Sequence, residues 1–147
     1  MARKIMFKLA FRTISFSCSL VLFDHHIIEY LPNQGDSMVP ALFNNDRVLV
    51  DRVSYRHFGK KFKHNDIVTI LRPLDPEILI CKRIVAMEGE TVYNEFKDSI
   101  IIPRNHVWVM GDNLHASSDS REFGPVPLGL LQGRVMLTFF PEQHLIR

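Results

Sequence analysis

Beyond Pro32 the chain is a series of short, strand-like runs separated by turn-forming sequences, and this pattern restricts the fold more than any other feature. The turns include Asn-Asn-Asp at residues 44–46, Glu-Gly-Glu at 88–90 and Gly-Pro at 124–125, which are combinations that interrupt regular structure. After residue 32 no long stretch shows the 3.6-residue apolar period of a helix. The pattern predicts a mainly β, compact antiparallel domain with strands at Arg47–Arg52, Asp66–Leu71, Ile78–Ala86, His106–Met110 and Gly133–Phe140.

The first 30 residues have a different character. Residues 13–23 are uncharged and largely apolar, and the charges before them, on Arg3, Lys4, Lys8 and Arg12, are all basic. A helix of 11 residues does not cross a hydrocarbon core of about 30 Å, but one that starts at Ile5 has about 19 residues. We therefore predict a membrane-associated, helical anchor or targeting segment at residues 1–30, followed by one folded domain at residues 31–147.

Three alternatives remain for the N-terminal segment: an interfacial amphipathic helix, a cleaved targeting peptide, or a helix packed on the core of the domain itself. If the segment is an anchor, its basic flank stays on the matrix or cytosolic side, because positive charges resist translocation. The rest of the chain then lies across the membrane.

Charge and composition exclude several classes of function. The chain has 18 Lys and Arg against 16 Asp and Glu, and it lacks the clustered cations of a nucleic-acid surface. Two cysteines are too few for a disulfide framework, and the seven histidines do not fall at zinc-ligand spacings. We expect no nucleic acid and no metal. The basic segment Arg56–Lys63 contains two Phe residues, and it either lies in solvent or contacts anionic lipid.

Ser37 is the first candidate for chemistry. It lies in the sequence GDSMVPAL, between a Gly-Asp turn and a segment restrained by Pro40. A serine hydroxyl becomes a useful nucleophile only beside a base. Taken alone, Ser37 is also compatible with an ordinary turn serine.

Lys82 is a candidate for that base. In the run ILICKRIVA, the period of two places Lys82 on one face with Ile78, Ile80, Ile84 and Ala86. An apolar environment lowers the pKa of a lysine and makes its neutral form available, and Ser–Lys pairs are a known variant of the Ser–His arrangement. The alternative is a lysine on an edge strand whose ammonium reaches water.

A third cluster of polar residues follows the predicted strand His106–Met110, in the sequence GDNLHASSDSREFGPVP. Asp119 and Arg121 are spaced to form a bidentate pair that holds this loop. The hydroxyl of Ser117 is able to donate a hydrogen bond to a lysine amine or to accept one from it. The alternative is a solvated turn.

The order of these pieces resembles the type I signal peptidase family, peptidase S26. The match consists of Ser-Met-x-Pro, an Asp-Ile-Val strand, Lys-Arg-Ile-Val with Glu-Gly-Glu, and Gly-Asp-Asn with a later Ser-x-Asp-Ser-Arg, and it runs from about Gly35 to Phe140. Within the family, the sequence ICKRIVAMEGE and the intact Asp-Ser-Arg loop are most similar to the mitochondrial inner membrane proteases.

The resemblance implies a membrane-bound serine endopeptidase with a Ser/Lys dyad and no cofactor. It implies that Ser37 is the nucleophile, Lys82 the general base and Ser117 the hydroxyl that orients the lysine, with Asp119 and Arg121 as a structural pair. The backbone N–H of Ser37 would stabilise the oxyanion. Bacterial relatives have a hydroxyl two residues before the nucleophile, where this chain has Gly35, so a second donor is not identified.

The function that we expect is removal of N-terminal sorting segments from preproteins delivered to the mitochondrial intermembrane space. The resemblance implies an inner-membrane location, with the catalytic domain facing that space, and a heterodimer with a homologous protease subunit. The alternatives are a bacterial or endoplasmic-reticulum signal peptidase, and a catalytically silent, membrane-anchored partner subunit.

Overall fold

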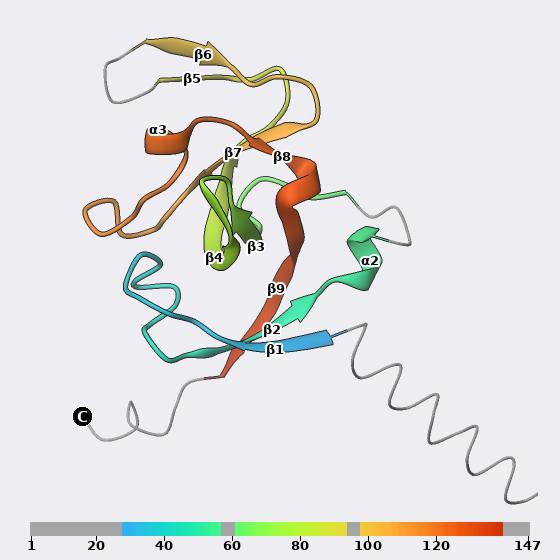
Figure 1. The fold of residues 1–147 in the computed structure, drawn as a ribbon, viewed down its shortest axis with the longest axis vertical. Helices are drawn as coiled ribbons and strands as arrows, with labels where there is room; N and C mark the ends of the chain where they lie inside the picture. Colours follow the sequence, from blue (N-terminus) through green and yellow to red (C-terminus); the bar gives the residue numbers. More distant parts are fainter. Residues whose placement is uncertain (1–27, 57–60, 94–97, 140–147) are drawn as a thin grey trace, which may run out of the picture.

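The computed structural model describes residues 28–56, 61–93 and 98–139 (Figure 1). Residues 1–27, which hold most of the predicted anchor, lie outside the described residues. Among the described residues, no helix is long and apolar enough to span a bilayer.

A seven-stranded antiparallel sheet forms the body of the described chain, in the order β1-β2-β9-β3-β4-β7-β8 (Figure 1). β5 and β6 form a separate two-stranded sheet. The strands are β1 (Ile28–Pro32), β2 (Arg47–Asp51), β3 (Ile67–Arg72), β4 (Asp75–Ala86), β5 (Thr91–Tyr93), β6 (Ser99–Ile101), β7 (His106–Met110), β8 (Val126–Pro127) and β9 (Leu131–Phe139).

The mainly β, antiparallel prediction is confirmed, and each of the five predicted strands is present to within about three residues at each end. β1, β5, β6 and β8 were not predicted. β1 pairs with β2 along its whole length, so the sheet begins at Ile28, inside the segment assigned to the anchor. The short helices are α2 (Val53–Arg56), α3 (Ser120–Phe123) and the 3₁₀ turn η1 (Leu128–Leu130).

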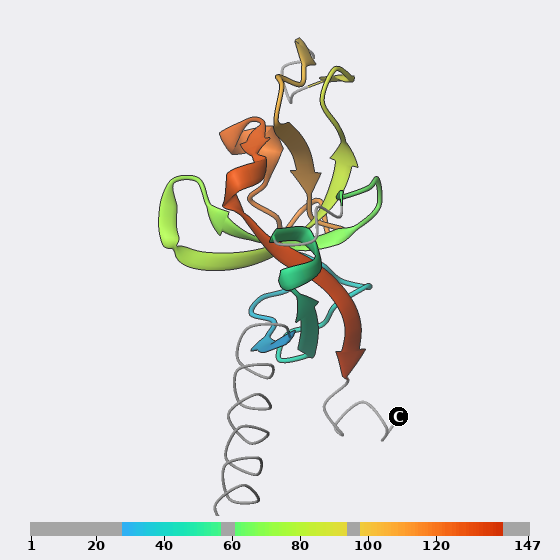
Figure 2. The same cartoon turned by 90° about the vertical axis from the view of Figure 1, so that its right-hand side faces the viewer.

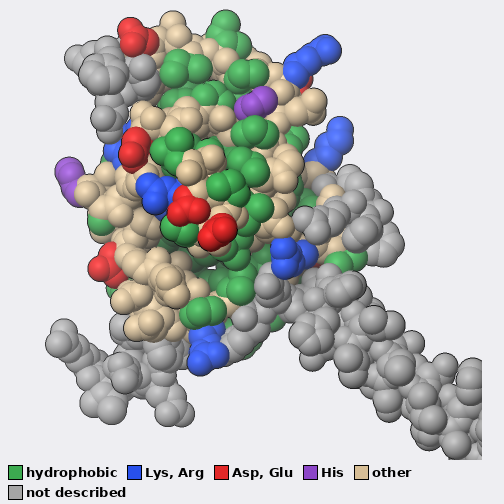
Figure 3. All heavy atoms as spheres, in the orientation of Figure 1, with side chains coloured by type: hydrophobic (Ala, Val, Ile, Leu, Met, Phe, Trp, Pro, Cys, Tyr) green, Lys and Arg blue, Asp and Glu red, His purple; other side chains and the backbone are tan. Residues whose placement is uncertain are grey.

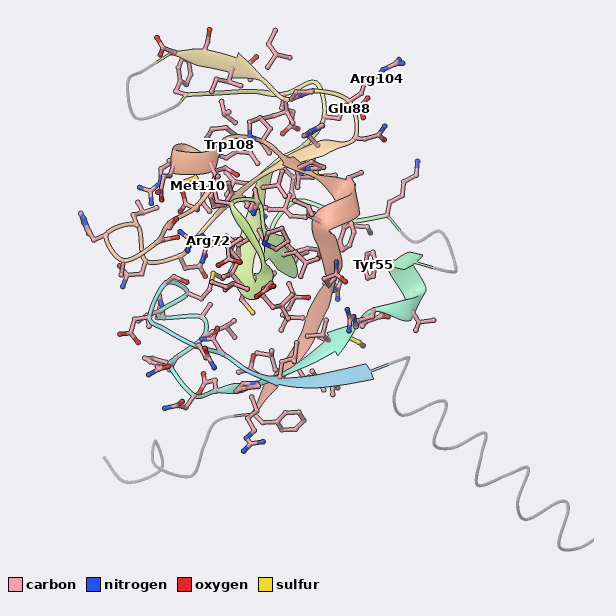
Figure 4. The ribbon with its side chains drawn as sticks, in the orientation of Figure 1. Tyr55, Arg72, Glu88, Arg104, Trp108 and Met110 are labelled. Carbon is pink, nitrogen blue, oxygen red and sulfur yellow. The ribbon has the colours of Figure 1, made fainter. Side chains whose placement is uncertain are left out.

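Three clusters of buried apolar side chains fill the interior. The largest lies between β3, β4, β7 and β8 and includes Val68, Ile84 and Val109. A second joins the loop after β1 to β2, and a third packs Trp108 of β7 beneath the small β5–β6 sheet (Figure 4). The visible face in Figure 3 is largely hydrophobic at its centre, with charged side chains scattered around it.

β4 carries the predicted base, and its burial changes along its length. The first four residues, from Asp75 to Ile78, are exposed, in a hairpin with β3 that extends sideways from the body (Figure 2). From Lys82 onward the predicted alternation holds, because Lys82, Ile84 and Ala86 are buried while Val85 is 44% exposed. The expectation that Ile78 shares the buried face is wrong, since this residue lies beyond the body of the sheet and is 42% exposed.

Candidate active site

Ser37 lies in the loop between β1 and β2. At the base of this loop, the backbone N–H of Asn33 donates to the carbonyl of Asp46 at 2.7 Å. The side chains of Met38 and Leu42, 0% and 1% exposed, pack into the core beside β2. The loop is therefore anchored from within, and Ser37 is held half-buried directly beside an apolar anchor.

The side chain of Lys82 reaches this loop from β4. Its Nζ is 2.8 Å from Ser37 Oγ and 3.0 Å from the carbonyl oxygen of Cys81. Lys82 is only 3% exposed. The alternative in which its ammonium reaches water is therefore wrong, and the serine and lysine singled out in the sequence are in hydrogen-bond contact.

The surroundings of Lys82 favour its neutral form. Burial lowers the pKa of Lys82 below its ordinary value of 10.5, and the Arg72 cation lowers it further, while Cys81 and Asp119 oppose this shift. Burial also raises the pKa of the Cys81 thiol to about 11. Because that thiol is neutral near pH 7, Asp119 is the opposing charge in that range.

Asp119 is the centre of the loop between β7 and α3. Its Oδ2 accepts hydrogen bonds from Ser117 Oγ at 2.8 Å and from the backbone N–H of Gly111 at 3.0 Å. Arg121 approaches with both Nε, 2.9 Å from Oδ1, and Nη2, 3.1 Å from Oδ2. Burial alone would raise the pKa of Asp119, but these hydrogen bonds outweigh it and lower the pKa. Asp119 thus forms the bidentate pair with Arg121 that its spacing suggests.

Ser117 differs from its expected geometry. Its hydroxyl donates to Asp119, and the hydrogen bonds of Lys82 Nζ go to Ser37 and Cys81 instead. The physical reason is that an ionised carboxylate is a stronger acceptor than an amine in competition for one hydroxyl proton. Ser117 is linked to Lys82 through the charge of Asp119.

The two loops are fastened to each other at Gly111 and Asn113. The backbone N–H of Asn113 donates to the Ser37 carbonyl at 3.0 Å, and its side-chain Nδ2 donates to the Asp36 carbonyl at 3.2 Å. A Cβ on Gly111 would lie 2.5 Å from the Ser37 carbonyl oxygen and still closer to Ser117 Oγ. Glycine is therefore required where the two loops touch.

A second ion pair next to the dyad was missed in the sequence. Arg83 donates from Nε to Asp112 Oδ1 at 2.8 Å and from Nη2 to Asp112 Oδ2 at 2.6 Å. This pairing raises the pKa of the Arg83 guanidinium. It links β4, one residue after Lys82, to the loop after β7, and the antiparallel register Arg83↔Met110 brings the two residues together. The adjacent Lys-Arg and Gly-Asp-Asn motifs were the available signal.

The backbone N–H of Ser37 is available to a ligand. Within the described residues, the N–H of Ser37 has no hydrogen-bond acceptor, whereas the N–H of Gly35 donates to Asn44 Oδ1 at 2.9 Å. Gly35, with φ of +87°, makes the turn that precedes the serine. In the part of the chain that is described, no group of three or more His, Cys, Asp or Glu side chains is arranged to hold a metal ion.

The arrangement is that of a nucleophile, a buried amine and a stabilised loop, and comparison with known proteins identifies its class. The family model described as signal peptidase, peptidase S26, matches residues 6–101 and 93–140. The chain belongs to the peptidase S26 family. It is a serine peptidase of the signal-peptidase type, as the sequence motifs predicted.

Several curated relatives resemble this S26 peptidase over most of its length. It is 37% identical over 149 residues to mitochondrial ATP-independent inner membrane protease subunit 1a of Arabidopsis thaliana, covering 93% of this chain and 88% of the relative. Mitochondrial inner membrane protease subunit 1 of Homo sapiens is 35% identical over 144 residues, with 92% and 83% covered. Subunit 2 of the Schizosaccharomyces pombe protease is 35% identical over 127 residues, with 83% and 70% covered.

The sequence favours subunit 1 over subunit 2, and the resemblance to subunit 1 proteins is confirmed. Percentage identity separates the two subunits only weakly, since the subunit 2 of S. pombe reaches the same 35% as the human subunit 1. A solved structure, a signal peptidase I from Enterococcus faecalis V583, is 23% identical and has a TM-score of 0.48, covering 52% of this chain and 98% of that one.

Proposed function

We propose that this S26 peptidase is a mitochondrial signal-type endopeptidase in which Ser37 is the nucleophile and Lys82 the general base. The observation that carries the proposal is the 2.8 Å contact between Lys82 Nζ and Ser37 Oγ, made by a lysine that is 3% exposed. The names of the relatives support the mitochondrial inner membrane as its location.

The reaction follows from this contact. Neutral Lys82 accepts the proton of Ser37 Oγ as the oxygen attacks the scissile carbonyl carbon. The resulting oxyanion accepts a hydrogen bond from the Ser37 N–H. The Lys82 ammonium then gives its proton to the departing amine, which leaves an acyl-enzyme. In the second half, Lys82 deprotonates a water molecule that attacks the acyl carbon, and it then returns that proton to Ser37 Oγ as the serine leaves.

The remaining residues of the site support this chemistry. Asp119 and Arg121 hold the loop after β7, and Ser117 fixes one oxygen of Asp119. Asn113 fixes the two carbonyls around Ser37 and thereby the orientation of its N–H. Lys82 serves as both acid and base, so the reaction requires no cofactor.

The substrates that we propose are preproteins with an N-terminal sorting segment, presented at the membrane in extended form. The relatives carry the names of subunits 1 and 2 of one protease, which supports a heterodimer with a homologous subunit. The basic residues before residues 13–23 support an anchor whose catalytic domain faces the intermembrane space.

Single-turnover cleavage of a tethered preprotein by the purified full chain tests the proposal. We expect product with the native chain and with Ser99→Ala, an exposed serine on β6. Ser37→Ala and Lys82→Arg should each lower the rate by at least about 10⁴-fold, since a guanidinium does not release its proton. The circular dichroism spectra of both variants must match that of the native chain, so that the loss of cleavage rate is not caused by unfolding.

Turnover by either variant would refute the dyad. No turnover by the native chain alone, but turnover after addition of a homologous subunit with an intact serine that persists when this chain carries Ser37→Ala, would identify this chain as the silent partner. Digestion of the domain by protease added to mitoplasts tests its orientation, and protection from the protease would place it in the matrix.

A further inference from the structure

A cavity of about 640 Å³ lies apart from the dyad and from the loops that support it. It is enclosed by α2, the turn after β4, the start of β7, η1 and the start of β9. In Figure 2, α2 lies in front of β9 on this side of the molecule. The residues that give the cavity its apolar lining are Tyr55, Phe62, Met87, Val107, Leu128 and Leu131.

The apolar lining is built for a flexible, nonpolar ligand. The rings of Tyr55 and Phe62, which both line the cavity, are stacked with centroids 4.3 Å apart and an interplanar angle of 13°. Leu128, Leu131 and Val107 continue the main core cluster on the opposite side. Ligand sites of this size are typically apolar, with a few polar groups that fix the orientation.

Two cations, Arg52 and Lys61, line the same cavity. Arg52 is held in place by the hydrogen bond from its Nη2 to Gln132 Oε1 at 2.8 Å. Lys61 is exposed, and no partner contacts its side chain within the described residues. The cavity therefore offers positive charge on one side and hydrocarbon inside.

The carboxylate that lines the cavity is paired elsewhere. Glu88 accepts a hydrogen bond from the backbone N–H of Asn105 at 2.9 Å and lies 3.8 Å from the guanidinium of Arg104. Figure 4 shows Glu88 beside Arg104 and well away from Tyr55 on α2. Glu88 thus pairs at its own end of the cavity, and the cations Arg52 and Lys61 belong to the α2 side.

The α2 side of the cavity also adjoins the point where the N-terminal segment enters the sheet. Ile28, the first residue of β1, pairs with Asp51, which directly precedes Arg52. Both Figure 1 and this register place the start of β1 beside α2. If residues 1–30 are a membrane anchor, Arg52 lies within one strand of the membrane surface.

We propose that this cavity binds an anionic phospholipid of the membrane that anchors the chain. An acyl chain occupies the apolar lining, and the phosphate lies against Arg52 and Lys61. This proposal rests on the proposed membrane anchor but not on the peptidase activity. It also chooses between the two interpretations of the basic segment Arg56–Lys63, since Lys61 and Phe62 of that segment line the cavity.

Photolabelling of the purified full chain tests the proposal. The probe is phosphatidylglycerol with a diazirine in its acyl chain, added to the chain in neutral detergent, and the labelled peptides are mapped by mass spectrometry. We expect labels on the peptides that contain Tyr55, Phe62 and Leu128. Unlabelled phosphatidylglycerol should compete, whereas phosphatidylcholine and inorganic phosphate at the same concentration should not.

Variants separate the cavity from general lipid contact. Lys61→Gln should weaken labelling about fivefold, the effect of one cation near an anionic lipid. Leu128→Trp should abolish labelling by filling the space. Lys63→Gln is the matched control, because Lys63 carries the same charge in the same segment but does not line the cavity. Ser37→Ala should label like the native chain, which keeps this test independent of the dyad.

Three results would overturn the proposal. They are equal labelling by the phosphatidylcholine probe, labelling that Lys61→Gln does not reduce more than Lys63→Gln, and loss of labelling when a homologous subunit is bound. The last result would assign the cavity to a subunit interface. If Leu128→Trp fails to fold, the comparison of Lys61→Gln with Lys63→Gln still tests the proposal.

Discussion

The two loops that meet at the dyad are held in different ways. The loop between β1 and β2, which carries Ser37, is anchored by the buried side chains of Met38 and Leu42. The loop between β7 and α3 is organised by the carboxylate of Asp119, which accepts hydrogen bonds from Gly111, Ser117 and Arg121. Apolar anchoring does not change with the protonation of any group, whereas an ionised centre does. The apolar anchors of the Ser37 loop therefore do not respond to pH, although this loop also contains the buried carboxylate of Asp46, which accepts a hydrogen bond from the backbone N–H of Phe43. Lys82, in contrast, faces a loop organised around an ionised carboxylate.

The largest expected effect is that of Asp119→Ala. It removes the acceptor of the Ser117 hydroxyl and of the Gly111 N–H, and it removes the carboxylate partner of Arg121. Breaking a buried ion pair costs about 3–5 kcal/mol in the free energy of unfolding. Because the pKa of Asp119 is lowered by folding, its stabilising effect is complete above its unfolded value near 3.8 and is lost as pH falls through the folded pKa. Urea denaturation at pH 7 and at pH 3 measures this, and an equal difference at both pH values would contradict the pH-sensitive half of the comparison.

Met38→Ala is the matched change in the other loop. It removes a fully buried side chain beside the nucleophile, and such truncations cost about 2–4 kcal/mol. The Met38 side chain is not ionisable, so the difference from the native chain should be the same at pH 7 and at pH 3 in the same denaturation experiment. A loss that depended strongly on pH would show that the Ser37 loop is not anchored by apolar contacts alone.

Ser117→Ala should lower kcat/KM about 10- to 100-fold, since it removes one hydrogen bond to Asp119 worth roughly 1–3 kcal/mol. The dyad itself is unchanged, so activity should stay well above that of Lys82→Ala. Ser118→Ala is the control, because the side chain of Ser118 contacts Arg72 and Glu122, outside the Asp119 centre. A larger loss in Ser118→Ala than in Ser117→Ala would show that Asp119 is not the centre that supports the dyad.

The smallest effect concerns Arg72, which lies between β4 and the loop after β7 (Figure 4) and donates to Ser118 Oγ at 3.3 Å. Its cation lowers the pKa of Lys82, so Arg72→Gln should raise that pKa slightly. The ascending limb of the kcat/KM profile then moves to higher pH by the same amount. Arg72→Lys keeps the charge and should leave the limb in place. A shift in both variants would indicate a steric cause.

The strands were predictable because each carries its own signal. The β-rich runs and their flanking turns located β2, β3, β4, β7 and β9, and the turns at Asn45, Asn65 and Gly89 adopt the positive φ that their residue types favour. β5, β6 and β8 contain only two or three residues each, too few to show alternation. Such strands form only because neighbouring segments supply their hydrogen-bond partners. The sequence of the strand itself does not show where those partners are.

Some features of the site were likewise predictable from local sequence, and others were not. Alternation in ILICKRIVA indicated that Lys82 shares a face with Ile84 and Ala86, but it did not show which face of β4 is covered. The Arg83–Asp112 pair joins residues 29 positions apart, and only the β4–β7 register reveals it. Ser117 was placed beside a lysine by resemblance, and the competing carboxylate two residues later could be weighed only in three dimensions.

The pH dependence of kcat/KM for the native chain tests the central claim, that Lys82 acts as a neutral, buried base. This profile reports the pKa of the essential base in the free enzyme. Since burial lowers the pKa of Lys82 and only the neutral amine accepts a proton, activity should rise with pH through a midpoint below the ordinary lysine value of 10.5. An ascending limb centred near 10.5, or a rate that does not change between pH 5 and 9, would contradict the account.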